Sequence, residues 1–337
     1  MQEHLIPSPL FNENAVDSRD TQRIFGGETT GISNLNDIKY DWVAPTYRIM
    51  VGNHWVPEKV DLSKDKITIK NLTPEEDEAV QDTLSFLIFL DSFQGNNLPN
   101  IKQYITCPGV GNLIAIQLFQ EVIHSQSYQY LLDALYPFTT REAIYNRWRT
   151  NPHLLKRNRF IADIADRFLA DPSKEHMKEV LVANYILEGI YFYQGFNLFY
   201  QLASRQKLVQ TAKMIKYIEN DEVTHVGLFA NIMREEMDPT GLDQDLIVRM
   251  VMQGVEHEIE WTRETYGNRI LGISTASSEQ FVKWLAGDRL ARVRIPSPYG
   301  NIQNPYRHLD ADKRENFFET TVTEYSRADT VTGWEEF

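Results

Sequence analysis

The feature that most restricts the fold of this chain is a Glu-x-x-His pair that occurs twice, as Glu121/His124 and Glu222/His225. On a helix, side chains three positions apart point the same way, so the carboxylate and the imidazole of such a pair can reach one metal ion. A single pair is a weak signal, because glutamate and histidine also meet at this spacing by chance. Two pairs, each inside an apolar segment, predict helices that direct metal-binding side chains into a core.

Two further acids strengthen this prediction, because each lies in an apolar helical segment that precedes one of the pairs. Asp91 comes 30 residues before the glutamate of the first pair, and Glu188 comes 34 residues before that of the second. Burying unpaired carboxylates on core-facing stripes costs several kcal/mol each. Pairing with distant basic groups is one way to offset this cost. However, few basic residues lie on those stripes, whereas two metal ions would neutralise the acids.

These residues match the pattern of ferritin-like dimetal carboxylate bundles, in which two helices each supply an acid and two supply Glu-x-x-His. The sequence therefore predicts an all-α, ferritin-like helical bundle with a dimetal carboxylate site in its core. Mixed oxygen and nitrogen ligands suit iron or manganese, and the lack of thiolates argues against structural zinc. The predicted metal ligands are Asp91, Glu121, His124, Glu188, Glu222 and His225.

Helix-start and helix-stop residues divide the rest of the chain. Thr73 is an expected N-cap, Pro74 occupies the first helical position, and this helix should end near Gly95. A short alternation over 66–70 is the main strand-like pattern. Further helices are expected over 111–136, 140–169 with an interruption near Pro152, 173–204, 206–236, 242–266 and 277–293.

Composition separates three parts: an extended N-terminal arm over 1–35, a ferritin-like helical domain over 36–308, and a flexible C-terminal tail over 309–337. The arm has no clear periodicity. The tail is rich in Asp, Glu and Thr but keeps aromatic residues such as Tyr325 and Trp334. This composition suits folding onto a partner, and an ordinary frayed terminus is the alternative.

Charge and cysteine content bear on partners and compartment. The net charge of −13 argues against nucleic acid as a partner and against tight attachment to an anionic membrane. The one cysteine, Cys107, cannot form an internal disulfide, and no signal peptide opens the chain, so we expect a cytoplasmic protein. The apolar run over 181–203 approaches the length of a membrane span, but polar residues around its helix favour burial inside a bundle.

Tyr128 is the next informative residue, because it lies four positions after His124 and therefore on the same helix face, near the expected metals. It either packs, as most tyrosines in bundles do, or it is oxidised by the metal centre and keeps the radical. Phe192, Phe196 and Ile218 would shield such a radical. Position alone leaves both interpretations open.

Four segments resemble the small, radical-generating subunit of class I ribonucleotide reductase. They are LDSFQ (90–94), EVIHSQSY (121–128), LEGIYFYQGF (187–196) and NDEVTH (220–225). The resemblance extends from the region of Trp55 to the C-terminus. It implies a homodimer that uses two metal ions and oxygen species to generate and store a one-electron oxidant. A large subunit would receive this oxidant and reduce ribonucleotides to deoxyribonucleotides.

The resemblance also implies roles for individual residues. Asp91, Glu121 and His124 would bind one ion, and Glu188, Glu222 and His225 the other, with some carboxylates bridging. Tyr128 matches the radical tyrosine. Trp55 matches the tryptophan of the electron-transfer route, followed by Asp221 and then His124. Tyr325 resembles the tyrosine that relays the radical to the large subunit, to which the C-terminal tail would dock.

One position departs from the family pattern. Gln117 stands where well-known diiron members have a tryptophan, which changes the surroundings of the metals. Tyr128 and Asp91 together disfavour the members that replace the tyrosine with phenylalanine. Two locations for the oxidising equivalent therefore stay open, namely Tyr128 and the metals themselves.

Two other functions fit a dimetal bundle. A ferritin-like ferroxidase or metal-storage protein would bind the same ions, but it has no use for Trp55 or an aromatic tail. A stand-alone dimetal oxidase would need an open cavity beside the metals, whereas the expected cluster of Phe192, Phe196 and Ile218 suggests a filled one.

Overall fold

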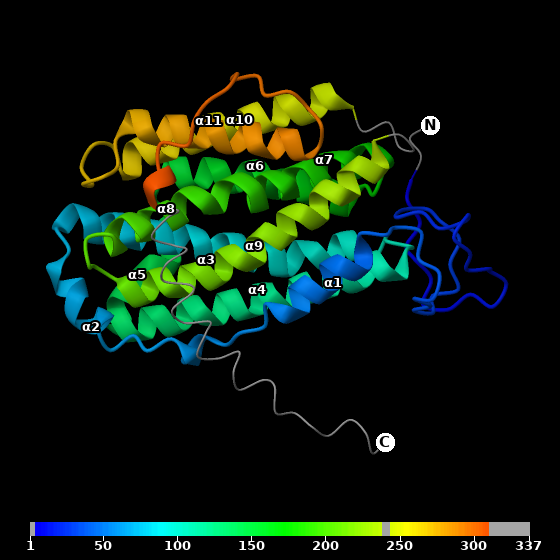
Figure 1. Ribbon diagram of the computed structural model, residues 1–337, viewed down its shortest axis with the longest axis horizontal. Helices are drawn as coiled ribbons and strands as arrows, with labels where there is room; N and C mark the ends of the chain where they lie inside the picture. Colours follow the sequence, from blue (N-terminus) through cyan, green and yellow to red (C-terminus); the bar gives the residue numbers. More distant parts are fainter. Residues whose placement is uncertain (1–3, 238–242, 310–337) are drawn as a thin grey trace, which may run out of the picture.

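Four long helical stretches form the centre of the structure, a computed structural model that describes residues 4–237 and 243–309. Helix α3 packs against α4, α8 packs against α9, and contacts of α3 with α8 and of α4 with α9 close the ring (Figure 1). The predicted all-α, ferritin-like bundle is thus confirmed. The stretches are α3 (Pro74–Lys102), α4 (Pro108–Leu135), α7 (Lys174–Ile186) continued by α8 (Phe192–Ala203), and α9 (Val209–Glu236).

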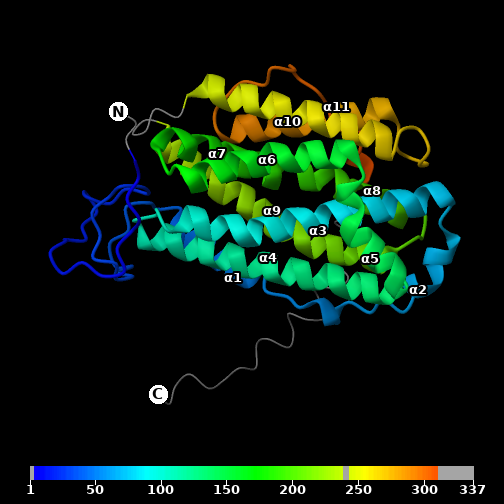
Figure 2. The same cartoon turned by 180° about the vertical axis from the view of Figure 1, so that it is seen from behind.

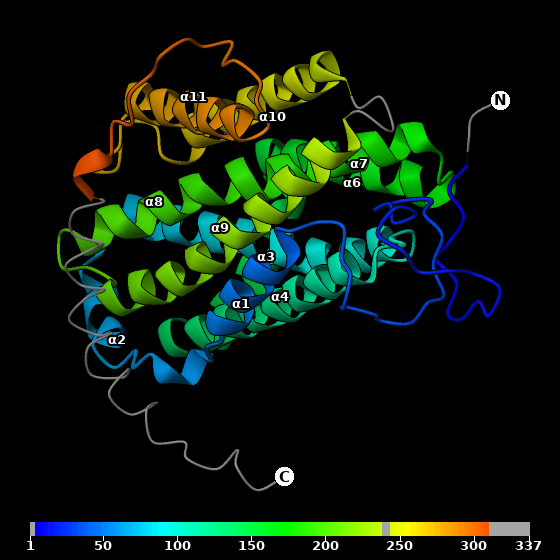
Figure 3. The ribbon, with the colours of Figure 1, turned by 45° about the vertical axis from the view of Figure 1, so that its right-hand side comes forward.

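Shorter helices cover this ring on two sides. Helix α1 (Val43–Gly52) lies against α4 and α9, as Figure 3 shows. On another side α6 packs on α7, α10 packs on both, and α11 packs on α10, forming the outer layer seen in Figures 1 and 2. The remaining bounds are α2 (Asp65–Thr68), α5 (Phe138–Asn146), α6 (Pro152–Ala170), α10 (Gln244–Thr265) and α11 (Thr275–Arg292).

Local sequence explains where α3 begins but not where it ends. The Thr73 hydroxyl accepts the Glu76 N–H at 3.2 Å, and the Glu76 carboxylate accepts the Thr73 N–H at 3.0 Å, which is a complete capping box. The predicted end near Gly95 is wrong, because the helix continues for two more turns. A helical glycine costs about 1 kcal/mol, and the burial of Leu98 and Ile101 beyond it more than offsets that cost.

The strand-like alternation over 66–70 is not a strand. The segment forms α2 and a 3₁₀ turn, Ile69–Asn71. Asp65 at the start of α2 instead accepts the Thr211 N–H at 2.6 Å and the Gln210 N–H at 3.2 Å, so it caps the first turn of α9. Five alternating residues are too few to separate strand from helix when such a tertiary contact competes.

The N-terminal segment differs from the helical core. Residues 4–35 contain no helix, and isolated β-bridges join His4 to Ser173 and Phe25 to Ile105. Within the described residues no β-strand is longer than such a bridge. The predicted C-terminal tail over 309–337, with Tyr325, lies outside the described residues apart from Leu309.

The apolar run is buried throughout from Leu181 to Leu202, as predicted for a central bundle helix. None of the helices in 4–237 and 243–309 has the length and apolarity needed to cross a membrane. One feature of this stretch was not predicted: a π-helical segment, Leu187–Tyr191, separates α7 from α8 and contains Glu188. Single π turns inside α-helices occur frequently at functional sites.

Candidate dimetal site

The six predicted metal ligands meet in one buried cluster between α3, α4, α9 and the π-helical segment. Their ligand atoms fall into two groups, within each of which every atom lies within 4.8 Å of the others. Glu121 and Glu222 belong to both groups, so their carboxylates can bridge two ions. Asp91 and His124 complete one group, and Glu188 and His225 complete the other.

The two histidines are oriented alike. The Nδ1 atom of His124 lies 3.0 Å from an Asp91 oxygen, and the Nδ1 atom of His225 lies 2.9 Å from a Glu222 oxygen. Both Nε2 atoms point away from the cluster: that of His124 to Asp221 at 3.1 Å and that of His225 to Gln120 at 3.0 Å. Outer hydrogen bonds of this kind fix the imidazole orientation and leave Nδ1 available for a metal ion.

The electrostatics of the cluster favour bound cations. Burial raises the pKa of the Asp91 and Glu188 carboxyls well above their ordinary values, and the carboxylates of Glu121 and Glu222 raise both further. Ionising all four acids is therefore unfavourable unless positive charge is added. Four buried carboxylate oxygens have no hydrogen bond, one each on Asp91, Glu121, Glu188 and Glu222. These oxygens and the two imidazoles suit two ions of iron or manganese.

Tyr128 is fully buried near this cluster, beside the Asp91 carboxylate. Burial, together with the nearby Asp91 carboxylate, raises the pKa of the phenol well above its ordinary value. Phe192, Phe196 and Ile218 are also buried, and the two phenyl rings stack with centroids 5.7 Å apart. The phenol is thus kept protonated and away from water.

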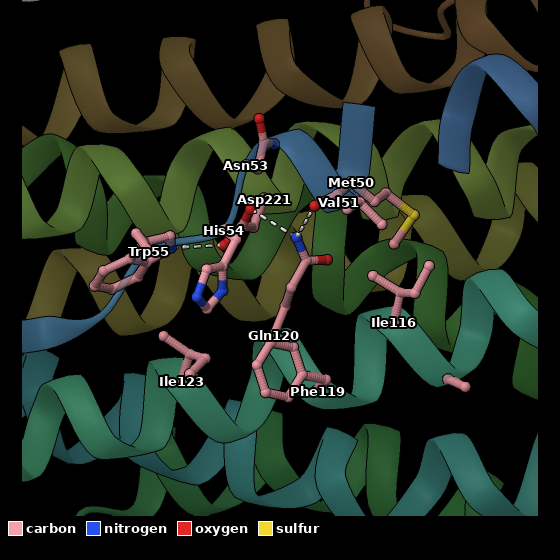
Figure 4. A pocket seen from close by; sticks show the side chains of 11 residues that line it. Met50, Val51, Asn53, His54, Trp55, Ile116, Phe119, Gln120, Ile123 and Asp221 are labelled. Atoms are coloured by element: carbon pink, nitrogen blue, oxygen red, sulfur yellow. Dashed lines mark hydrogen bonds between the residues drawn. The ribbon is translucent and has the colours of Figure 1, made fainter. Parts of the chain in front are cut away.

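Trp55 lies beside the cluster and is connected to it through Asp221. The indole Nε1–H donates to Asp221 Oδ2 at 2.9 Å, and the same oxygen contacts Nε2 of His124. Figure 4 shows this bond at the edge of a cavity of about 310 Å³. The Trp55 ring also stacks with the His124 ring, with centroids 6.2 Å apart. The structure therefore brings together Trp55, Asp221 and His124, three residues that the resemblance places on one route.

Three buried glutamines near the ligands have contacts that the sequence did not predict. The side-chain N–H of Gln120 donates to Asp221 Oδ1 at 2.8 Å (Figure 4), and its amide oxygen accepts from Nε2 of His225 at 3.0 Å. Gln120 thus joins the outer partners of the two histidines. Gln94 and Gln117 both donate to Oε1 of Glu188, Gln117 at 2.6 Å. The sequence did hold a signal for these contacts: Gln94 is three residues after the ligand Asp91, a spacing that places both side chains on one helix face.

A bundle of four long helical stretches that brings two acids and two Glu-x-x-His pairs to one buried centre is a ferritin-like dimetal carboxylate protein. Comparison with known proteins narrows this class. The family model "Ribonucleotide reductase, small chain" matches residues 32–305. The chain thus belongs to the ribonucleotide reductase small-chain family.

Individual relatives agree with this assignment. A ribonucleoside-diphosphate reductase subunit beta from Treponema pallidum is 37% identical, over 95% of each chain. A protein of the same name from Halalkalibacterium halodurans is 33% identical, over 93% of this chain and 94% of its own length. The structure of a ribonucleotide reductase R2 subunit from Clostridium botulinum superposes with a TM-score of 0.88 at 40% identity, covering 92% of this chain and 99% of that one.

These relatives confirm the resemblance seen in the sequence. They support a reductase small subunit over the two alternatives, a ferritin-like storage protein and a stand-alone oxidase. The predicted cofactor, two ions of iron or manganese per chain, is supported by the buried carboxylate and histidine cluster.

Proposed function

We propose that this small subunit generates a one-electron oxidant at its dimetal centre and passes it to a large subunit that reduces ribonucleotides to deoxyribonucleotides. The observation that carries the proposal is the unbroken contact from the ligand cluster through His124 and Asp221 to Trp55. A metal-storage protein has no need of such a connection. A ferroxidase would take up iron far beyond two ions per chain, whereas a reductase subunit should stop at two.

Two bound ions, when activated by an oxygen species, would supply the oxidising chemistry. In our proposal Asp91 and His124 hold one ion, Glu188 and His225 hold the other, and the remaining ligands Glu121 and Glu222 bridge them. The shared geometry of these two carboxylates supports this assignment. Gln94 and Gln117 restrict Glu188 by donating to one of its oxygens, which leaves the other for an ion.

Trp55 and Asp221 would act together in transfer toward the large subunit. Oxidation of an indole makes its N–H strongly acidic, so a proton acceptor in hydrogen-bond contact favours electron removal. Asp221 Oδ2, 2.9 Å from Nε1 of Trp55, is placed to hold that proton. Gln120 donates to the other oxygen of Asp221 and keeps the carboxylate in this orientation.

Tyr128 is the proposed resting place of the oxidant, because its phenol is dry and adjacent to Asp91. Replacing Tyr128 with phenylalanine should abolish the tyrosyl signal in electron paramagnetic resonance while two ions stay bound. Tyr130→Phe is the matched control, since Tyr130 is on the same helix but donates to the Val60 carbonyl at 3.1 Å. A multiline metal signal of full intensity in Tyr128→Phe would instead place the oxidant on the metals.

We further propose a homodimer, as the family resemblance implies, in which α1 and α4 face a second copy. Val51 of α1 and Phe119 of α4 line the cavity beside Trp55, and they are 47% and 49% exposed. Covering such side chains is a common role of a dimer interface.

Replacing Phe119 with lysine tests this interface. The buried ammonium should raise the dimer dissociation constant at least about tenfold, equal to about 1.4 kcal/mol, in sedimentation experiments. Leu271→Lys is the control, because Leu271 is 71% exposed and lies between α10 and α11. Equal dimer stability in the two variants would contradict the proposed interface.

The remaining assignments concern the ends of the chain and the compartment. We propose that the helical domain over 36–308 carries the metal chemistry, that the segment over 1–35 is an arm, and that the tail over 309–337 docks to the large subunit. Tyr325 in this tail would relay the radical. The single cysteine, which cannot form an internal disulfide, supports a cytoplasmic location.

A further inference from the structure

The π-helical segment Leu187–Tyr191 has an unusual partner in α11. The Nε–H of Arg289 donates to the backbone carbonyl of Gly189 at 2.8 Å, across 100 residues of sequence. A π turn disturbs the regular ladder of backbone hydrogen bonds, so a carbonyl in it gains from an outside donor. Gly189 directly follows Glu188. The contact therefore acts on the backbone next to a proposed metal ligand.

Arg289 fits closely against this segment. Its side chain is 6% exposed, and its guanidinium carbon lies 4.5 Å from the ring centroid of Tyr193. A Cβ atom added to Gly189 would lie 3.1 Å from both Cδ and Nε of Arg289, which is closer than normal packing. The Tyr185 hydroxyl also donates to the Arg289 backbone carbonyl at 2.8 Å. Residues before, within and after the π-helical segment thus all contact Arg289.

The conformation of the segment decides where Glu188 points. Converting a π turn into regular α-helix removes one residue from the turn and rotates the flanking side chains by about 100° relative to each other. Glu188 Oε2 now lies 3.6 Å from Nδ1 of His225. A rotation of that size would take the carboxylate out of the cluster.

We propose that Arg289 is a positioning residue: by holding the Gly189 carbonyl, it keeps the π-helical segment in the conformation that presents Glu188 to the metal site. This inference rests on the proposed two-ion site. It also connects α11 to the ligand cluster. Removing a residue that orients a metal ligand without binding the ion typically lowers metal affinity by about 10- to 100-fold.

Ion binding gives the first test. Arg289→Lys keeps the positive charge but loses the Nε–H donor, and Arg292→Lys is the matched control because Arg292 donates to Asp288 at 3.0 Å rather than to the π-helical segment. In a titration with Mn²⁺, the electron paramagnetic resonance signal of free Mn²⁺ is measured at each step and gives the number of bound ions. We expect one of the two ions to bind about 10- to 100-fold more weakly in Arg289→Lys and both to bind normally in Arg292→Lys. Equal weakening of both ions, or no change, would overturn the inference.

Hydrogen exchange of the metal-free protein gives a second test that does not depend on the ions. Amides over 187–193 should exchange faster in Arg289→Lys than in wild type, while those of α3 stay unchanged. Gly189→Ala places a methyl group 3.1 Å from Cδ and Nε of Arg289, so it should have a smaller effect of the same sign, and adding it to Arg289→Lys should change little more. Unchanged exchange over 187–193 in both single variants refutes the inference. Wild-type protein that binds fewer than two ions would refute the two-ion site instead.

Discussion

Replacing Trp55 with phenylalanine is expected to lower ribonucleotide reduction by at least about 100-fold, which corresponds to about 2.7 kcal/mol of added barrier. A phenyl ring cannot donate to Asp221, and it is much harder to oxidise than an indole. Trp55 is almost fully buried, and its bond to Asp221 connects it to His124. The measurement is deoxyribonucleotide formation by the metal-loaded protein with a large subunit.

A matched tryptophan variant separates the loss of electron transfer from a general loss of folding. Trp42 is partly buried, and its ring packs against Tyr40 with centroids 5.9 Å apart, away from Asp221. Trp42→Phe should therefore keep near-normal reduction. Both variants should bind two ions, since neither ring supplies a ligand. If Trp55→Phe keeps more than about a tenth of wild-type turnover, corresponding to less than about 1.4 kcal/mol, the proposed route through Trp55 is wrong.

Removing residues 325–337 is expected to abolish ribonucleotide reduction while the metal centre still forms. The six proposed ligands all lie before this segment, in α3, α4, α9 and the π-helical segment. The deletion should therefore leave two bound ions and the radical signal intact. Association with the large subunit, followed by sedimentation, should be lost with the activity.

Tyr325→Phe in the full-length chain distinguishes docking from radical relay. This variant should still associate with the large subunit, because it keeps the rest of the tail, but it should not support reduction. Unchanged reduction after the deletion would contradict the proposed role of the tail and would reopen the choice of a stand-alone oxidase. Normal turnover by Tyr325→Phe would contradict the relay alone.

The helices and the cluster were predictable because their signals are local. The i,i+3 spacing of each Glu-x-x-His pair and the apolar stripes around Asp91 and Glu188 need only the geometry of a helix. The start of α3 is equally local, and Thr73 is its N-cap as expected. The end of α3 was mispredicted, because the burial of Leu98 and Ile101 comes from neighbouring helices.

The supporting contacts were harder to predict because they join distant parts of the chain. Gln117 was noticed only as a departure from a family pattern, and its bond to Glu188 spans 71 residues. The bond between Arg289 and Gly189 has no sequence signal, since a glycine inside an apolar helix and an arginine near a helix end are both common. The π-helical segment itself was also not predicted.

The sequence by itself determined the fold class and the chemical type of the centre, because helical periodicity places acids and histidines on inward faces whatever the exact packing. Only the tertiary structure decided that Glu121 and Glu222 are shared between the two groups of ligand atoms. It likewise decided that Trp55 meets Asp221 across 166 residues and that α11 reaches the π-helical segment. These contacts depend on how helices cross and slide against one another, which the burial of the whole core sets and no single segment encodes.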